Sequence, residues 1–169
     1  MSLYEINQSN QNGDNKVEIL DLEIDVEWVR NIIYNEKEKI INVLSYFKDA
    51  KKQNGEAQEQ EIEIMFDIDD KNKKNELEKF YDKYIKEYEN EMDVLYNFFK
   101  DEEKIDEIDE ASENIKMAIY SITKSEKLTP KIFNIIIQKH TKSIADNKDK
   151  KLMKLFIFFL YRHCFIGEV

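Results

Sequence analysis

The segment from Leu152 to Phe165 constrains the fold more than any other part of this chain, because it contains an unbroken apolar run. From Leu155 to Tyr161 the chain reads Leu-Phe-Ile-Phe-Phe-Leu-Tyr. A helix that is apolar on all sides has no face for water, so it belongs at the centre of a domain. The run is too short to span a bilayer, which requires about 20 apolar residues. We therefore predict a central helix enclosed by other helices.

The rest of the chain carries apolar residues at the three- and four-residue spacing of amphipathic helices, within residues 25–52, 76–102, 104–124 and 130–145. Asp25 and the pair Thr129-Pro130 are typical of helix starts. Three glycines and one proline in 169 residues favour long helices over a sheet with many turns. We predict a mainly α fold, a bundle of about five helices. It forms one domain over residues 17–169, after a flexible N-terminal arm of residues 1–16.

Two short segments in the N-terminal part of the chain alternate apolar and acidic or polar residues, which is typical of half-buried strands. They are residues 17–24 and 60–68, and in the second of them Ile62, Ile64 and Phe66 lie two apart. We expect these segments to pair as a minor two-stranded β element beside the helices. A helical conformation is the alternative for both.

The net charge of −10 is concentrated in the middle of the chain. Residues 56–113 hold 22 acidic residues against 8 basic ones, whereas residues 114–169 hold 4 against 11. An acidic middle repels phosphate and argues against nucleic-acid binding. Charge complementarity speeds and selects protein encounters, so the acidic segment favours a basic protein as partner.

From this charge pattern we predict a non-catalytic, acidic protein–protein interaction module. Inhibitor or immunity-type proteins of basic partners are the kind of protein that uses such a surface. The candidate contact residues are Tyr84, Glu87, Tyr88 and Glu91, because tyrosine suits an interface and glutamates four apart share a helix face. The same aromatic spacing is also typical of a buried core. A homo-oligomer is a further alternative that the sequence leaves open.

The strongest catalytic pattern is Phe-Asp-Ile-Asp-Asp at residues 66–70, an apolar strand-like segment that ends in Asp-x-Asp. It resembles the first motif of the haloacid-dehalogenase-type phosphotransferases, and the resemblance covers residues 62–70. It implies Asp67 as the nucleophile and Asp69 as a proton-transfer residue near a bound magnesium ion. The Gly and Thr that usually follow are replaced by Asp and Lys. The alternative function is therefore a metal-dependent hydrolase or phosphotransferase that uses Asp67 and Asp69.

Soft metal ligands are scarce, since His140, His163 and Cys164 are the only histidines and cysteine in the chain. Zinc sites usually need three or four protein ligands in close spacing. We expect His140 to be a hydrogen-bonded core histidine, and we predict no metal and no cofactor. The first 20 residues lack a basic start followed by an apolar run, so we expect no signal peptide, no membrane association and a cytoplasmic location.

Overall fold

The computed structural model describes residues 24–47 and 67–169, and both ranges are largely helical. They contain eight α-helices and two 3-10 helices, and no strand occurs within them. In chain order the elements are α3 Val26–Asn35, α4 Glu38–Ile41, η1 Asn42–Phe47, α5 Ile68–Lys74, α6 Glu78–Tyr84, η2 Lys86–Tyr88, α7 Glu89–Asp101, α8 Ile105–Thr123, α9 Pro130–Thr141 and α10 Asn147–Arg162. The mainly α fold predicted from the sequence is confirmed.

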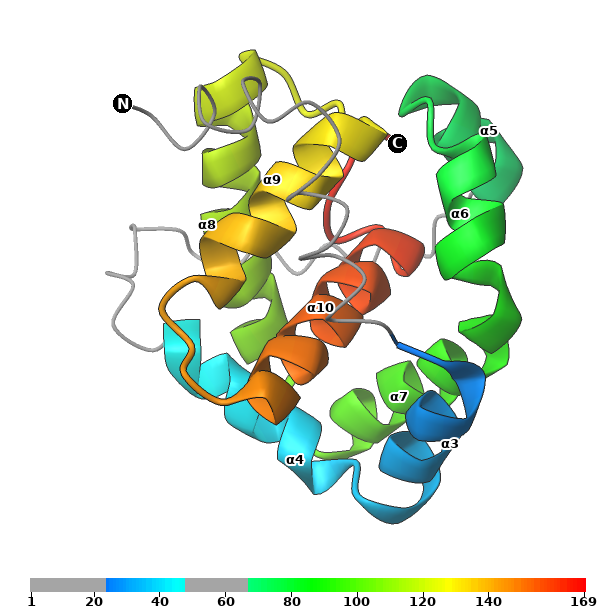
Figure 1. Ribbon diagram of the computed structural model, residues 1–169, viewed down its shortest axis with the longest axis vertical. Coiled ribbons are helices and arrows are strands. Elements are labelled where there is room, and N and C mark those ends of the chain that lie inside the picture. The colour runs from blue at the N-terminus through cyan, green and yellow to red at the C-terminus, as the bar shows by residue number, and fades with distance from the viewer. Residues whose placement is uncertain (1–23, 48–66) are drawn as a thin grey trace.

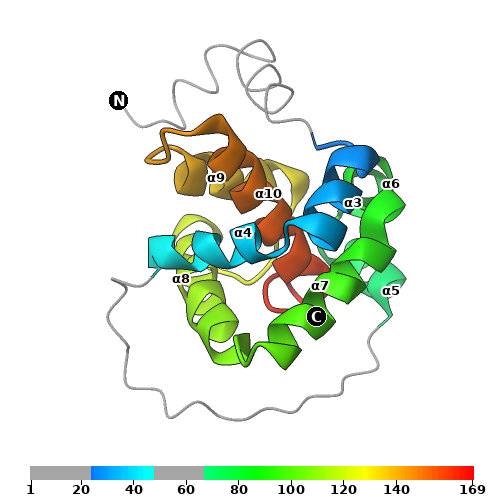
Figure 2. The same cartoon turned by 90° about the horizontal axis from the view of Figure 1, so that it is seen from below.

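Helix α10 lies in the middle of this arrangement (Figure 1). Helices α4, α7 and α9 and the 3-10 helix η1 pack directly against it. Helix α8 packs against η1 and α9, and α3 packs against α7, so that a second set of helices extends the shell (Figure 2). The predicted enclosure of the C-terminal apolar segment by other helices is therefore confirmed.

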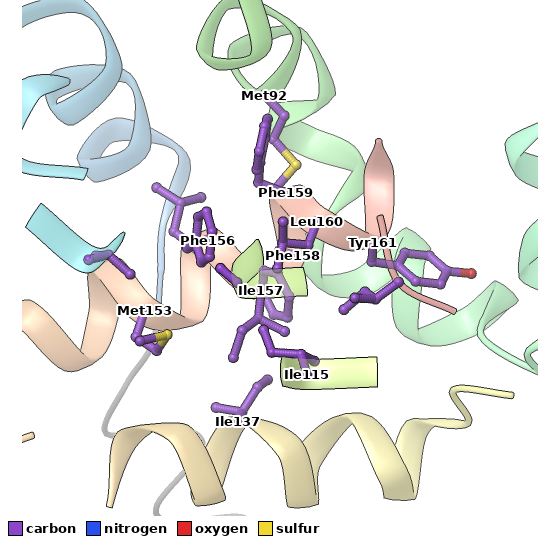
Figure 3. Close-up of a cluster of buried hydrophobic side chains, with 14 of the residues drawn as sticks. Met92, Ile115, Ile137, Met153, Phe156, Ile157, Phe158, Phe159, Leu160 and Tyr161 are labelled. Atoms are coloured by element: carbon purple, nitrogen blue, oxygen red, sulfur yellow. The ribbon is translucent and has the colours of Figure 1, made fainter. Parts of the chain in front are cut away.

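Burial along α10 is continuous, because every residue from Leu152 to Tyr161 is at most 5% exposed. The helix starts where the Asp146 carboxylate accepts hydrogen bonds from two backbone N–H groups of the first turn, at 2.6 and 3.2 Å. Its apolar side chains project in several directions around the axis, toward side chains of other helices such as Met92, Ile115 and Ile137 (Figure 3). No stripe of this segment is left for solvent.

Two of the predicted long helices are broken, which corrects the predicted bundle of about five helices. The segment predicted over residues 25–52 ends its first helix at Asn35 and continues as α4 and η1. The segment predicted over residues 76–102 breaks at Ile85, whose φ and ψ are −121° and −38°, and continues as η2 and α7.

The length of α10 explains these breaks. A straight helix over residues 76–102 would be about 40 Å long, whereas the 16 residues of α10 span about 24 Å. A chain that must keep its apolar face on so short a central helix has to bend around it. The buried side chain of Ile85 stays in the core while the backbone changes direction there.

The predicted helix starts are confirmed. The Asp25 carboxylate accepts a hydrogen bond from the Trp28 N–H at 2.7 Å, and the Thr129 hydroxyl accepts one from the Ile132 N–H at 3.4 Å. Pro130 is the first residue of α9. A proline is favourable there because the first helical N–H has no partner within the helix.

The predicted N-terminal arm and two-stranded β element fall almost entirely outside the described residues. Of the two strand candidates, the structure describes Ile24, Asp67 and Ile68 alone. Ile68 is the first residue of α5, so the second candidate segment has become helical by that position. Across the described helices, none is long and apolar enough to cross a membrane.

Candidate protein-docking surface

The turn between α7 and α8 places a run of carboxylates at the surface. Helix α7 ends at Asp101, and Glu103 adopts a left-handed conformation with φ +56°. The Lys104 N–H donates to the Phe99 carbonyl oxygen at 2.9 Å, which closes the helix end and reverses the chain. Residues 101–113 then carry eight acidic residues against a single lysine.

Packing of α8 decides which of these acids reach solvent. Ile108, Ala111 and Ile115 lie on the buried side of α8 and are fully enclosed. The acidic residues between them therefore occupy the outer side of the helix. The exposed carboxylates, which we call the acidic surface, belong to Asp101, Glu102, Glu103, Asp106, Asp109 and Glu113.

Like charges are crowded within the acidic surface. Partial burial, followed by repulsion from Asp106, raises the pKa of the Asp109 carboxyl group. At its far end Glu113 pairs with Lys116 at 3.3 Å, which neutralises part of the charge. Asp106 and Glu107 also lie at the positive end of the α8 dipole, where acids stabilise a helix. Helix stability thus accounts for the acidic residues in the first turn of α8, but not for the carboxylates before and after that turn.

An open groove adjoins the acidic surface, between η1, α8 and α9, with a volume of about 430 Å³. We call it the η1–α8–α9 groove, and its lining residues are Tyr46, Phe47, Asn114, Met117, Ala118, Ser121, Lys139 and His140. The His140 Nδ1 lies 2.9 Å from the Ile136 carbonyl oxygen, and burial lowers the pKa of its imidazole. The hydrogen bond predicted for His140 is confirmed, but its side chain is half-buried at the groove rather than enclosed in the core.

Large apolar side chains are exposed along this groove and beside it. Tyr46 is 46% exposed, Met117 53% and Tyr120 56%. Met117 and Tyr120 belong to an uncharged stretch of α8, residues 117–123, which lies between two lysines. Within this stretch Ala118 and Ile119 are buried, whereas Met117 and Tyr120 face solvent.

The residues predicted to bind a partner do not form one exposed surface. Tyr88 is 3% exposed and Glu91 4%. Glu91 accepts a hydrogen bond from the Arg30 Nε at 2.9 Å, so its carboxylate joins α7 to α3. The Tyr88 hydroxyl donates to the backbone carbonyl of Tyr84. Of the four positions, Glu87 is exposed and Tyr84 is partly exposed. Partner binding at these positions stays a prediction.

Asp67 and Asp69, the candidate catalytic residues, lie at the start of α5. The Asp67 Oδ1 accepts a hydrogen bond from the Asp69 N–H at 2.9 Å, so Asp67 is the N-cap of that helix. Both side chains are exposed. In residues 24–47 and 67–169 no group of three or more His, Cys, Asp or Glu side chains could hold a metal ion. Helix capping explains the Asp-x-Asp pattern, and a catalytic role for it stays a prediction.

A buried polar cluster under the C-terminus was not foreseen from the sequence. Lys71 is 2% exposed, and its ammonium group donates to the carbonyl oxygens of Tyr161 and Ile166 at 2.6 and 2.7 Å. Its Nζ also lies 3.5 Å from the Cys164 Sγ and 4.2 Å from the centre of the Tyr161 ring. Burial lowers the pKa of Lys71 from 10.5 to about 8.

Two asparagines complete the cluster and tie α5 to the C-terminal residues. The Asn72 Oδ1 accepts a hydrogen bond from the Tyr161 hydroxyl at 2.8 Å. The Asn75 amide donates to the Glu168 carbonyl at 2.7 Å and accepts from the Glu168 N–H at 3.0 Å. Gly167 has φ +87°, and a Cβ there would lie 3.0 Å from the Tyr161 ring. The cluster is closed to solvent and positions the chain end.

The sequence contained a weak signal for this cluster. The spacing places Lys71, Asn72 and Asn75 on one side of a short helix. Lys73 and Lys74 are lysines of the same segment, yet both are exposed. Nothing in residue type separates the buried lysine from its neighbours. The difference arises from the docking of residues 161–168, which are distant in sequence.

Fold and surface together define a small, mainly helical domain, built on one buried helix and acidic on one side. Residues 13–167 match the family described as C-terminal domain 12 of the ABC-three component (ABC-3C) systems. The chain belongs to this family. Comparisons with curated proteins and with solved structures gave no match.

Proposed function

We propose that this chain is a non-catalytic docking domain of an ABC-three component system. In this proposal, the acidic surface binds a basic surface on another component of the system. The family description supports the existence of protein partners, because it names a system of several components. The observation that carries the choice of surface is the row of exposed carboxylates from Asp101 to Glu113, on a rigid turn and one helix face.

The physical basis is long-range attraction. Single-sign clusters of charge raise the local concentration of an oppositely charged partner and can speed association by one to several orders of magnitude, roughly 10- to 1000-fold. The chain as a whole carries −10, so its net charge has the same sign as the acidic surface. Phosphate backbones are repelled by the same field.

More specifically, we propose that the chain inhibits the component to which it binds, as an immunity-type protein does. An acidic surface that covers a basic active or nucleic-acid-binding face would exclude its ligand by occupying the same charges. The backbone hydrogen bonds that close the α7–α8 turn support it, since a preformed surface loses little conformational entropy on binding.

The test is the binding of the purified chain to each of the other two components of its system, measured by surface plasmon resonance at low and high salt. The variant Glu102→Lys reverses one charge of the acidic surface. Its matched control is Glu78→Lys, an exposed glutamate in the first turn of α6 that changes the net charge equally. We expect Glu102→Lys to slow association several-fold at low salt and Glu78→Lys to leave it nearly unchanged.

High salt should reduce binding of the unaltered chain and bring it close to that of Glu102→Lys, because salt screens exposed charges. Binding that is indifferent to salt would overturn the proposal. Equal effects of the two variants would do so as well, because they would show that net charge rather than this surface governs the encounter.

A further inference from the structure

We propose that the η1–α8–α9 groove receives an aromatic side chain from the same basic partner, so that one docking surface extends along α8 from charge to apolar contact. This inference rests on the proposed function and deepens it. The two parts are continuous, because Glu113 of the acidic surface is followed on the same helix by Asn114 and Met117, which line the groove. A partner segment lying along α8 therefore meets carboxylates first and the groove within one further turn.

The exposed apolar side chains beside the groove support an occupant. Met117 and Tyr120 are both more than half exposed, although α8 has a fully enclosed side available for apolar residues. Exposed apolar area of this kind is costly to keep in water and is typical of interaction sites when it is contiguous. Tyrosine is also enriched among residues that dominate binding energy.

The chemistry of the groove wall favours an aromatic anchor. Phe47, Met117 and Ala118 offer apolar contact, and a methionine sulfur packs favourably at the edge of an aromatic ring. Asn114 and Ser121 add polar groups to the same wall, which suit an apolar body with a polar tip. The volume of about 430 Å³ accommodates one such side chain.

Charge decides between a basic partner and a second copy of this chain. A second copy brings another net −10 and another acidic surface to the contact. Like charges placed opposite each other cost affinity, typically several kcal/mol when they are juxtaposed at an interface. A basic segment that carries an aromatic residue satisfies both halves of the α8 surface at once.

The experiment measures binding of the same two purified components to the variants Tyr120→Ala and Met117→Ala. The matched control is Tyr34→Ala on α3, because Tyr34 is 58% exposed and Tyr120 56%. We expect Met117→Ala in the groove and Tyr120→Ala beside it each to weaken binding at least tenfold, mainly through faster dissociation, with the salt dependence unchanged. Tyr34→Ala should bind like the unaltered chain.

The possible outcomes separate this inference from the proposed function. If Glu102→Lys slows association but Tyr120→Ala and Met117→Ala bind like Tyr34→Ala, the groove is not part of the contact and the proposed function stands. If neither set of variants has an effect, both the proposed function and this inference are wrong.

Two further results would assign the groove to another occupant. Sedimentation of the chain alone as a dimer that Tyr120→Ala dissociates would assign the groove to a second copy. If free Tyr120→Ala were less thermally stable than free Tyr34→Ala, Tyr120 would pack within this chain itself rather than against a partner. Either result would overturn the inference.

Discussion

Lys71 shows how a residue that looks like solvated charge can hold a fold together. Its ammonium group donates to the carbonyl oxygens of Tyr161 and Ile166, and so joins α5 to the last turn of α10 and the residues after it. The Tyr161 carbonyl also accepts from the Cys164 N–H at 3.2 Å, so Lys71 is a second donor there. A buried polar group left without its partner costs about 1–3 kcal/mol. The Lys71 Nζ also lies 4.2 Å from the centre of the Tyr161 ring, and this contact offsets part of the cost of burying the charge.

The variant Lys71→Met should therefore lower the free energy of unfolding at pH 7 by about 1–3 kcal/mol, since it removes the donor but keeps a long apolar stem. Urea unfolding followed by circular dichroism measures this difference. Lys74→Met is the control, because Lys74 is exposed on the same helix. A Lys71→Met chain as stable as the control would show that the hydrogen bonds contribute nothing net.

The pH dependence of this effect follows from the pKa of Lys71, which is lowered from 10.5 to about 8. Between these two pH values the unfolded chain binds more protons than the folded one, so the contribution of Lys71 to stability rises with pH. The loss caused by Lys71→Met should thus grow from pH 8 to about 10.5, by up to about 3 kcal/mol. Comparing the two chains at each pH removes the effect of the other titrating groups. A difference that stays constant would contradict the lowered pKa.

At the scale of secondary-structure elements, α10 organises the other helices. The apolar run, the helix starts at Asp25 and Thr129, and the segments of α8 and α9 could all be predicted, because periodicity and capping are local properties. The breaks at Asn35 and Ile85 could not. They depend on how the chain packs around a helix that lies far away in sequence. Residues 35–39 are all polar at the first break, as on any exposed helix face, and the apolar spacing continues across the second break at Ile85.

Truncation of a central residue tests this organisation. Phe156→Ala should lower the free energy of unfolding by about 3–5 kcal/mol, because Phe156 is fully buried and its removal leaves a cavity between α10 and the surrounding helices. Met117→Ala on α8 is the comparison, with an expected change within about 0.5 kcal/mol for an exposed side chain. Equal and small effects of both variants in urea unfolding would mean that α10 is not the centre of the core.

At the scale of the whole molecule, the charge pattern was readable from the sequence but the residues that present it were not. The acidic middle predicted a basic partner, and residues 101–113 do carry exposed carboxylates. Glu91 and Tyr88 had the residue types and spacing of an interface, yet both are buried, and Glu91 accepts a hydrogen bond from Arg30 of α3. Which side of a helix faces solvent depends on its neighbours, and sequence spacing alone does not supply them.

The claim that α8 is the docking element can be tested directly by amide hydrogen exchange of the chain, alone and bound to the other components of its system. We expect the added protection to be concentrated in residues 101–124, with a smaller effect around Tyr46 and little change in α3 and α5. Protection centred on α3, α5 or the C-terminal residues, with residues 101–124 exchanging as in the free chain, would contradict it.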